Sequence, residues 1–246
     1  MHNLIKKNSK LIRLIERLLG AKIYTTLPIG LDLHLDIEYN LKNLNIKTIF
    51  DVGANIGESE NYFSKSFPYS NIYCFEPIPS SFNRLKRNIK GTNSSCFNFG
   101  FGEVASLQEI FTYENPNLSS YNSINASFFD NEIKIKEQIE IKTISTFCSE
   151  NNINHIDLLK IDTEGFDLKV LLGAKEMLEN GKISIIQVEA SMTSKNDFHV
   201  YFDEFIKLLS PYNFEIFGIY DQILDFKLQK PILRRTNITF INYSKL

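Results

Sequence analysis

Two hydrophobic patterns alternate along the chain. Short runs rich in β-branched and aromatic residues, first Thr48–Val52 and then Asn71–Phe75, predict strands that are covered on both faces. The segments after them, Glu58–Phe67 and Pro79–Ile89, show the helical spacing of apolar residues. Strands that alternate with helices in this way indicate an α/β fold with a mostly parallel sheet.

The alternation continues toward the C-terminus, with one interruption. Further strands are predicted at Ser95–Phe99, Ile156–Ile161, Ile183–Val188, Phe214–Tyr220 and Ile238–Tyr243, and further helices at Asp167–Leu178 and Phe198–Leu209. Leu107–Tyr113 and Gln138–Thr143 interrupt the series as a predicted antiparallel pair. The long segment between them, Glu114–Asn131, is interpreted either as a lid or substrate loop or as a mobile surface loop.

The N-terminal part has a different pattern. Residues 3–19 form a candidate amphipathic helix with leucine and isoleucine on one face and lysine and arginine around it. Either it contacts a membrane surface or a partner, or it caps the domain core or joins a homodimer, and we favour the second interpretation. Leu31–Asp36 then predicts a short half-exposed strand or an extended lead-in. We expect a helical extension and lead-in over residues 1–40 and one α/β domain over residues 41–246.

Composition sets bounds on this domain. The chain has 246 residues, of which 43% are hydrophobic, and this is enough for a full core. A formal net charge of -2 gives no bulk attraction to nucleic acid. Cys74, Cys96 and Cys148 are far apart and odd in number, which suits a reducing, cytoplasmic location without disulfides or a cysteine metal site. No apolar run reaches the roughly 20 residues of a transmembrane segment.

A glycine turn follows the first predicted strand. The sequence Asp51-Val52-Gly53-Ala54-Asn55-Ile56-Gly57 reads D-x-G-x-N-x-G. Asn55 replaces the middle glycine of a dinucleotide fingerprint, and no Lys-Ser/Thr pair follows Gly57, so a P-loop is excluded. A turn of this kind beside a carboxylate suits a ligand with an ammonium group and no phosphate, such as S-adenosylmethionine. The alternative is a sheet-to-helix turn with purely structural glycines.

A second acidic residue marks the end of the next strand. Glu76 lies about 20 residues beyond the glycine turn, where an acidic side chain meets a ribose in nucleotide-binding folds. Pro77 stops the strand, and the alternative role for Glu76 is a charge at the start of the following helix. Gly100 and Phe101 follow the third strand and are expected on the adenine side of the same ligand.

Five landmarks in this order resemble a known family. They are Phe50–Gly57, Phe75-Glu76-Pro77, Ile156–Gly165, Ile186–Glu189 and Asn237–Asn242. From about Leu27 to the C-terminus the chain resembles the FkbM family of S-adenosylmethionine-dependent methyltransferases. The resemblance implies a class I methyltransferase fold, which is a Rossmann-like, seven-stranded, mostly parallel sheet with an antiparallel last strand. It also implies O-methylation of sugars, glycans, lipid-linked saccharides or polyketide-type hydroxyls.

The resemblance assigns roles residue by residue. Asp51, Gly53, Asn55 and Gly57 match the methionine-binding turn, to which Ala54 belongs, and Glu76 matches the ribose-binding acid, with Pro77 beside it. At the adenine position the family usually has a small-residue turn and an aspartate. This chain has Gly100-Phe101-Gly102-Glu103 there, so that contact departs from the family pattern.

Three further carboxylates are candidates for catalysis. Asp162, Glu164 and Glu189 follow the fourth and fifth strands of the predicted sheet, at its ligand end. We expect one of them, Asp162 first, to take the proton of an acceptor hydroxyl or to help hold a divalent cation such as Mg²⁺, with Asp162 and Glu189 as possible ligands. The alternatives for Glu164 are a cap of the following helix or a turn ordered through backbone N–H groups, and the alternative for Glu189 is a helix-start charge.

The histidines are set aside at this stage. His155 precedes its strand and is therefore expected at the opposite end of the sheet. His34 and His199 do not lie at a sheet terminus, so a neutral imidazole without a catalytic role is expected for both. Arg234 and Arg235 are interpreted either as a phosphate-binding pair or, preferably, as solvated charges.

Other functions stay open at this point. The leading hypothesis is an O-methyltransferase for a sugar, glycan or nucleotide-linked small molecule, in surface polysaccharide or secondary-metabolite biosynthesis. The alternatives are an N-methyltransferase for a small amine or amide and a cofactor-binding regulatory protein without turnover. The missing middle glycine argues against an NAD-dependent oxidoreductase. Nucleic-acid methylation is disfavoured because no basic stripe with interleaved aromatic residues is present.

Overall fold

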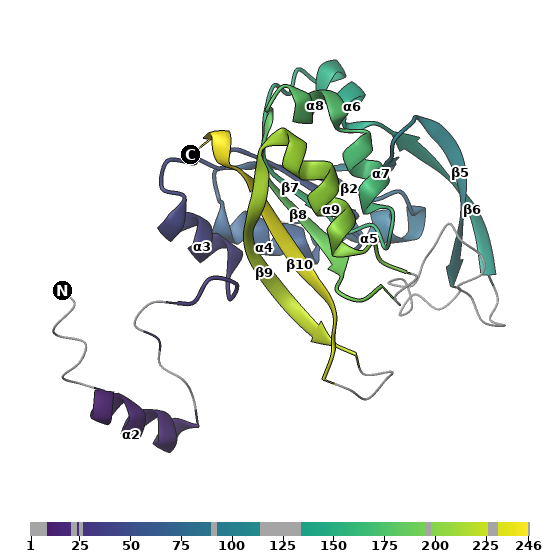
Figure 1. Ribbon diagram of the computed structural model, residues 1–246. Coiled ribbons are helices and arrows are strands. Elements are labelled where there is room, and N and C mark those ends of the chain that lie inside the picture. The colour runs from purple at the N-terminus through teal and green to yellow at the C-terminus, as the bar shows by residue number, and fades with distance from the viewer. Residues whose placement is uncertain are drawn as a thin grey trace.

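A seven-stranded sheet forms the centre of the computed structural model, which describes residues 9–20, 24, 27–89, 93–113, 134–194, 198–225 and 231–245 (Figure 1). The strand order is β3 (Ser94–Phe97), β2 (Asn71–Phe75), β1 (Thr48–Val52), β7 (Ile156–Ile161), β8 (Ile183–Ser191), β10 (Leu233–Asn242) and β9 (Phe214–Leu224). The pairs from β3 through β8 are parallel, and β10 runs antiparallel to both of its neighbours. The mostly parallel sheet with an antiparallel last strand is therefore confirmed.

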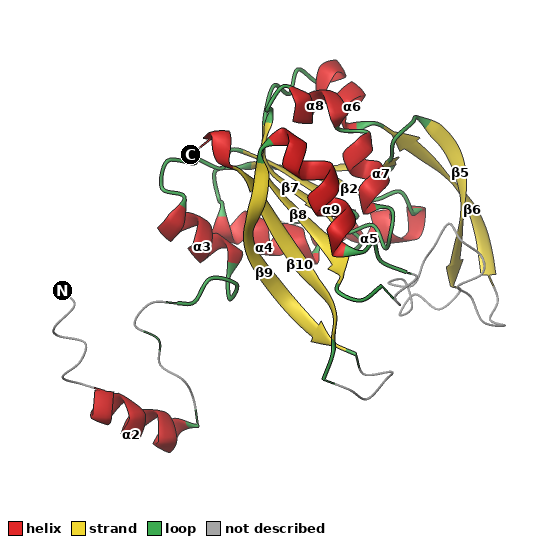
Figure 2. Ribbon diagram, in the orientation of Figure 1, coloured by secondary structure: helices red, strands yellow, loops and turns green. Residues whose placement is uncertain are grey.

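Helices cover both faces of the sheet (Figure 2). One face carries α3 (Leu33–Asn40), α4 (Glu58–Ser66) and α5 (Pro79–Asn88), and the other carries α6 (Ile144–Glu150), α7 (Asp167–Leu172), α8 (Lys175–Glu179) and α9 (Phe202–Leu209). Successive strand residues point to opposite layers. Ile49 packs in the α3–α5 layer and Phe50 in the α6–α9 layer. Burial of a large apolar side chain contributes about 1.5–3 kcal/mol, so both layers stabilise the sheet.

A smaller sheet lies beside the first. Its order is β4 (Gly100–Phe101), β6 (Lys134–Lys142) and β5 (Ser106–Tyr113), and the antiparallel pairing of β5 with β6 confirms the predicted pair. Phe101 anchors it, because its ring is 2% exposed and lies 4.5 Å from the ring of Phe75, between centroids. The Phe101 side chain therefore packs in the core, and the expectation that it lines the adenine side is not supported. The proposed loop at 114–131 lies outside the described residues.

The lead-in before the sheet is a helix, and the predicted strand or extended segment at Leu31–Asp36 is wrong. The side chain of Asp32 caps α3 by accepting a hydrogen bond from the backbone N–H of Leu35 at 2.9 Å. Leu33 and Ile37, four residues apart, then share the buried face. The alternation of apolar residues favoured a strand, but the N-cap hydrogen bond of Asp32 stabilises a helix here.

One buried carboxylate ties this helix to the far edge of the sheet. Asp36 accepts hydrogen bonds from the backbone N–H of Gly30 and from the hydroxyl of Tyr220 in β9, each at 2.8 Å. Asp36 and Tyr220 are both buried. Charge-assisted hydrogen bonds of this kind are among the stronger ones, so the segment before β1 is fixed to the last part of the sheet.

Three predicted element boundaries differ in the structure. The helix predicted at Asp167–Leu178 is two helices that meet at Gly173, whose carbonyl accepts a hydrogen bond from the backbone N–H of Ser145 at 3.1 Å. The helix predicted from Phe198 begins at Phe202, and β8 continues through Ser191. Two short 3₁₀ helices, Ser210–Tyr212 and Tyr243–Lys245, complete the described elements.

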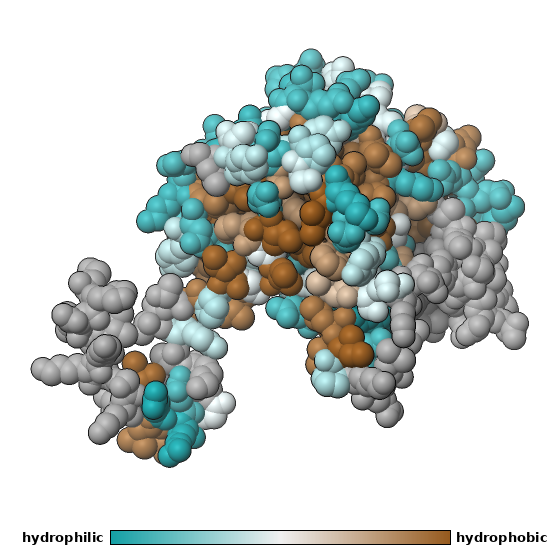
Figure 3. Space-filling model, in the orientation of Figure 1, coloured by the Kyte–Doolittle hydropathy of each residue, from teal (hydrophilic) through white to brown (hydrophobic). Residues whose placement is uncertain are grey.

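The N-terminal helix α2 (Ser9–Leu19) lies apart from the sheet (Figure 1). It confirms the predicted helix over residues 9–19, while residues 3–8 lie outside the described part. Leu14, Leu18 and Leu19 are 55%, 77% and 68% exposed, so this helix does not cap the domain core. Figure 3 shows its apolar and hydrophilic atoms together at the surface. Among the described residues, none of the helices combines the length and the apolar character that a membrane crossing requires.

Candidate active site

The glycine turn after β1 is built as the sequence predicts. Gly53 has φ +82°, and a Cβ atom there would overlap with the backbone carbonyl of Asp162, so only glycine fits. The N–H groups of Gly53 and Ala54 both donate to the carbonyl of Phe75 at 3.0 Å. Gly57, at φ +93°, leads into α4. The turn therefore lies across the carboxyl ends of β1, β2 and β7.

Glu76 closes this turn from the neighbouring strand. One carboxylate oxygen accepts a hydrogen bond from the backbone N–H of Asn55 at 2.9 Å, and the other accepts from that of Ile78 at 2.8 Å. Burial raises the pKa of Glu76 to about 7, although both backbone hydrogen bonds lower it. The structure thus brings Asn55 and Glu76 into direct contact. Gly100 packs against Pro77 on the other side of Glu76.

Asp51 lies beneath the turn with a lysine as its counter-ion. Its side chain is fully buried, and Oδ1 is 3.4 Å from Nζ of Lys160, its partner in register on β7. The same ammonium group is 3.3 Å from Oδ2 of Asp162. Burial raises the pKa of Asp51, while Lys160 acts in the opposite direction. Burial disfavours the charge on Lys160, but Asp162 and Asp51 outweigh it and raise the pKa of this lysine.

Lys160 was missed as a functional residue, although a signal was present. It interrupts the otherwise apolar run Leu158-Leu159-Lys160-Ile161 in a strand that was predicted to be buried. A lysine in such a place needs a partner with the opposite charge. Asp51 in β1 and Asp162 directly after β7 provide it.

The loop after β7 holds two of the three candidate carboxylates. Asp162 remains 36% exposed at its side chain. Asp167 accepts hydrogen bonds from the hydroxyl of Thr163 at 2.9 Å and from the N–H of Gly165 at 3.3 Å, and burial followed by repulsion from Asp162 raises its pKa to about 6. Asp167 therefore orders this turn, which was the alternative role considered for Glu164. Glu164 has φ +53° and directs its side chain elsewhere.

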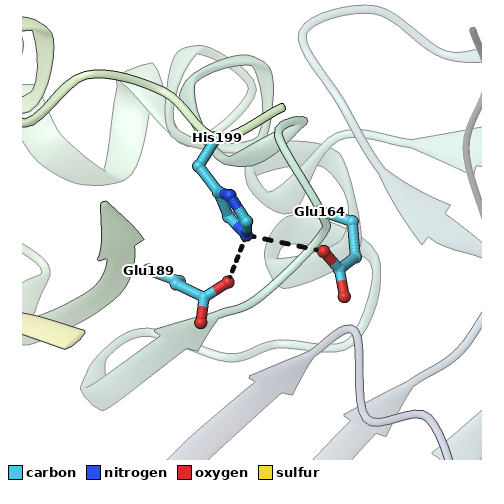
Figure 4. Close-up of side chains that lie close together, drawn as sticks. All are labelled: Glu164, Glu189 and His199. Carbon is cyan, nitrogen blue, oxygen red and sulfur yellow. Dashed lines mark ion pairs between the residues drawn. The ribbon is translucent and has the colours of Figure 1, made fainter. Parts of the chain in front are cut away.

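Glu164 meets Glu189 and His199 (Figure 4). Nε2 of His199 is 2.6 Å from Oε2 of Glu189 and 3.6 Å from Oε2 of Glu164. The other oxygen of Glu189 pairs with the guanidinium of Arg235 on β10. Glu189 lies within β8, so it is not a helix-start charge, and Arg235 is not simply solvated. His155 lies at the opposite end of the sheet, as expected, where it contacts Ser184 at 2.8 Å.

His199 was missed because no local pattern places it. The backbone N–H of Ser191 donates to the carbonyl of Val200 at 2.8 Å, and this bond returns the loop to the end of β8. The imidazole is thereby carried to the carboxyl end of the sheet without belonging to a strand. The short distance in sequence from the end of β8 was the only available signal.

A pocket of about 310 Å³ lies between the N-terminal ends of α3 and α4 and the strands β7 to β10. Its lining combines carboxylates, amides, hydroxyls and one ammonium group with a few apolar side chains: Leu31, Asp32, Leu33, Glu58, Ser59, Tyr62, Phe63, Lys160, Gln187, Tyr220, Asp221 and Asn237. Lys160 joins this pocket to Asp51 and Asp162. Polar groups of this density are suited to a ligand with several hydroxyls.

The strand order, with its single antiparallel strand next to the edge, and the glycine turn after β1 are those of the class I methyltransferase fold. Residues 51–216, more than half of the chain, match the methyltransferase FkbM domain. The chain therefore belongs to the FkbM methyltransferase family. The resemblance seen in the sequence is confirmed.

Three curated relatives are similar to this chain. Methyltransferase 1 of Beauveria bassiana (strain ARSEF 2860) is 31% identical over 145 residues, which cover 51% of this chain and 57% of the relative. Hexuronic acid methyltransferase AglP of Haloferax volcanii is 25% identical over 150 residues, covering 60% and 58%. The 2-O-methyltransferase NoeI of Sinorhizobium fredii (strain NBRC 101917 / NGR234) is 26% identical over 148 residues, covering 53% and 58%. The chain thus spans less than two thirds of each relative.

Proposed function

We propose that the protein transfers the methyl group of S-adenosylmethionine to a hydroxyl of a sugar, a glycan or a nucleotide-linked small molecule. The pocket beside Lys160 carries this proposal, because amide, carboxylate and hydroxyl side chains line it at the acceptor half of the sheet. Two relatives support it: one is named a hexuronic acid methyltransferase and one a 2-O-methyltransferase. Such a product belongs to surface polysaccharide or secondary-metabolite biosynthesis in the cytoplasm.

The cofactor is proposed to lie over β1 and β2. The turn from Gly53 to Gly57, which Asp51 supports, would hold its methionine part, and Glu76 would accept hydrogen bonds from its ribose hydroxyls. For this, the carboxylate of Glu76 exchanges a backbone hydrogen bond for the ribose, since it accepts from Asn55 and Ile78 in the structure. The adenine lies on the side of Pro77 and Gly100.

Methyl transfer is an in-line displacement in which an acceptor oxygen attacks the methyl carbon. The carbon–sulfur bond breaks, its electron pair stays on sulfur, and S-adenosylhomocysteine leaves. The hydroxyl proton must pass to a base. Asp162 is proposed for this step, because its side chain is 36% exposed and held by Lys160, whereas one oxygen of Glu189 is occupied by Arg235.

Two measurements test the function. Calorimetry with S-adenosylhomocysteine and with NAD separates a methyltransferase from an oxidoreductase, and only the first ligand is expected to bind. A labelled methyl donor is then offered with monosaccharides, uronic acids, nucleotide sugars and small amines. Methylation of hydroxyl acceptors is expected; methylation of amines alone would support the N-methyltransferase alternative, and any turnover excludes a purely regulatory protein.

A matched pair of variants tests the base. Asp162→Asn is expected to lower the rate of methyl transfer by about 10²–10⁴-fold while S-adenosylhomocysteine still binds. Asp203→Asn serves as the control, because Asp203 forms an exposed ion pair with Lys207 on α9. Normal turnover of Asp162→Asn would assign the proton to another group.

A further inference from the structure

Glu164, Glu189 and His199 direct one ligand atom each toward a common point (Figure 4). They come from three separate segments: the loop after β7, the end of β8 and the loop before α9. Their ligand atoms all lie within 4.8 Å of one another. We propose that this cluster binds a divalent first-row transition-metal cation.

The contact between Glu189 and His199 is not an ordinary hydrogen bond. Oε2 of Glu189 is 2.6 Å from Nε2 of His199, yet this oxygen has no partner with hydrogen-bond geometry among the described residues. Glu189 is 7% exposed, so this oxygen lies inside the protein. Carboxylate oxygen and imidazole nitrogen bind such cations at about 2.0–2.2 Å, so a shared cation would move these two atoms from 2.6 Å to roughly 3 Å apart.

The backbone brings the two loops together. Gly165 lies so close to the carbonyl of Phe198 that a Cβ atom would overlap with it, so the loop after β7 packs directly against the residue before His199. Glu164 has a left-handed φ of +53°, which is uncommon for a residue other than glycine. Such strain persists only where the surroundings impose it. In this backbone conformation, the Glu164 carboxylate points toward the imidazole of His199.

Arg235 completes the arrangement from the other side. Its guanidinium holds one oxygen of Glu189 and leaves Oε2 directed at the cluster. Partners of this kind orient metal ligands and are a regular part of metal sites. The side chains of His199 and Glu189 are 5% and 9% exposed, and that of Glu164 is 28% exposed. Two of the three ligands are therefore buried, and Glu164 is the one in contact with solvent.

The donor set selects the kind of cation. One imidazole with two carboxylates suits Mn²⁺, Fe²⁺ or Zn²⁺ better than Mg²⁺, which prefers oxygen ligands alone. This differs from the magnesium site expected on Asp162 and Glu189, because Asp162 pairs with Lys160. A cation here would bind an acceptor hydroxyl and lower its pKa. That role rests on the proposed function, whereas metal binding itself does not.

Metal binding is measured first, without cofactor or acceptor. The chelator-treated full chain is titrated with Mn²⁺ and followed by electron paramagnetic resonance and by the broadening of the His199 ring signals in NMR. One Mn²⁺ per chain is expected, and Glu164→Gln and His199→Ala are each expected to weaken binding at least about tenfold. His155→Ala is the matched control, since His155 is also 3.6 Å from a carboxylate, that of Asp157. Unfolding curves show which variants are folded.

Two results would overturn the proposal. One is equal Mn²⁺ binding by the unmodified chain and folded His199→Ala, which would leave the cluster as an ion-paired imidazole. The other is a loss of binding in Asp162→Asn with no loss in Glu164→Gln, which would move the cation to Asp162 and Glu189. Mn²⁺ binding together with methylation of amines alone would retain the site and refute the proposed function.

Discussion

Asp51 and Lys160 face each other in register on the neighbouring strands β1 and β7, with 3.4 Å between Oδ1 and Nζ. Both side chains are at most 9% exposed. Asp162, at the end of β7, shares the same ammonium group. One buried cation thus lies beside both the turn proposed to hold the cofactor and the carboxylate proposed to accept the proton.

Replacing this lysine by methionine is expected to destabilise the protein. Lys160→Met keeps the approximate length of the side chain but leaves the buried carboxylate of Asp51 without its counter-ion, which typically costs about 3–5 kcal/mol. The free energy of unfolding in denaturant is expected to fall by this amount at about pH 8, and by less at acidic pH, because protonated Asp51 needs no cation.

An exposed lysine provides the control for this variant. Lys175 pairs with Glu179 on α8 at 3.7 Å, and its side chain is 66% exposed, so Lys175→Met is expected to change the stability by less than about 1 kcal/mol. If Lys160→Met were as harmless as Lys175→Met, the ion pair would not stabilise the turn.

The affinity for S-adenosylhomocysteine is expected to depend on pH through Glu76. Burial raises the pKa of this carboxyl to about 7, and the ribose hydroxyls are expected to bind its ionised form. Calorimetry should therefore show an affinity that falls up to about tenfold for each pH unit below 7. Glu76→Gln should bind more weakly and without this pH dependence. A parallel pH dependence in the variant would assign it to another group.

The same shift has a consequence for stability without the ligand. A carboxyl whose pKa is raised on folding stabilises the protein below its unfolded pKa of about 4.5, and this stabilisation is lost as the pH rises to about 7. Relative to Glu76→Gln, the unmodified protein is expected to lose about 3 kcal/mol of unfolding free energy between about pH 4 and pH 8. Denaturant unfolding of both proteins measures this difference, and a constant difference would contradict the raised pKa.

Alanine substitutions at Gly53 and Gly181 distinguish the cost of backbone strain from the cost of steric overlap. Gly53 and Gly181 both have positive φ, +82° and +58°, so alanine is strained at each. At Gly181 the nearest atom to a new Cβ is the flexible Lys245 ammonium at 3.6 Å, whereas at Gly53 the backbone of Asp162 is in the way. Gly181→Ala is expected to lower the free energy of unfolding by about 1 kcal/mol, and Gly53→Ala by at least about 3 kcal/mol. Gly53→Ala is also expected to abolish cofactor binding. Equal costs in unfolding experiments would show that the overlap relaxes.

Helix α2 is expected to bind an anionic membrane surface. It exposes Leu14, Leu18 and Leu19 and carries Arg13 and Arg17. Burial of each leucine is worth up to about 1.5–3 kcal/mol, and each basic residue about 1 kcal/mol near anionic lipid. Sedimentation with phosphatidylglycerol vesicles measures the binding, which should fall at high salt.

Serine substitutions test the contribution of the leucines. The double variant Leu14→Ser/Leu18→Ser is expected to remain in the supernatant, while Leu107→Ser, a substitution at an exposed leucine on β5, should sediment like the unmodified protein. If the protein ignored vesicles and formed a dimer that the double variant abolished, the helix would be a homodimer contact instead.

The sequence was sufficient for the parts of the fold that follow one pattern locally. β1, β2 and β7 are short, apolar and β-branched, and the glycine turn after β1 has a specific spacing, so each was found within a residue or two. The break at Gly173 was not predicted, because the apolar spacing runs through this residue and its hydrogen bond with the N–H of Ser145 is a tertiary contact.

The candidate site divides in the same way. Asp162, Glu164 and Glu189 were predicted at one edge of the sheet because parallel strands bring their carboxyl ends together, and Glu164 and Glu189 do lie close together. Their partners were not found. His199 reaches the site through a loop. Arg235 reaches it from β10, an antiparallel strand far from the other site residues in sequence. Tertiary contacts decide both positions, and no periodicity encodes them.

Asp36 lies before the matched range 51–216 and Tyr220 lies after it, so their hydrogen bond joins two segments outside that range. A chain shortened to that range would lose α3, the start of β1 and all of β10. The edge of β8 would then be unpaired, and an unpaired edge is a template for self-association. A fragment for expression therefore has to include every strand of the sheet. A fragment cut at the limits of sequence similarity is expected to aggregate.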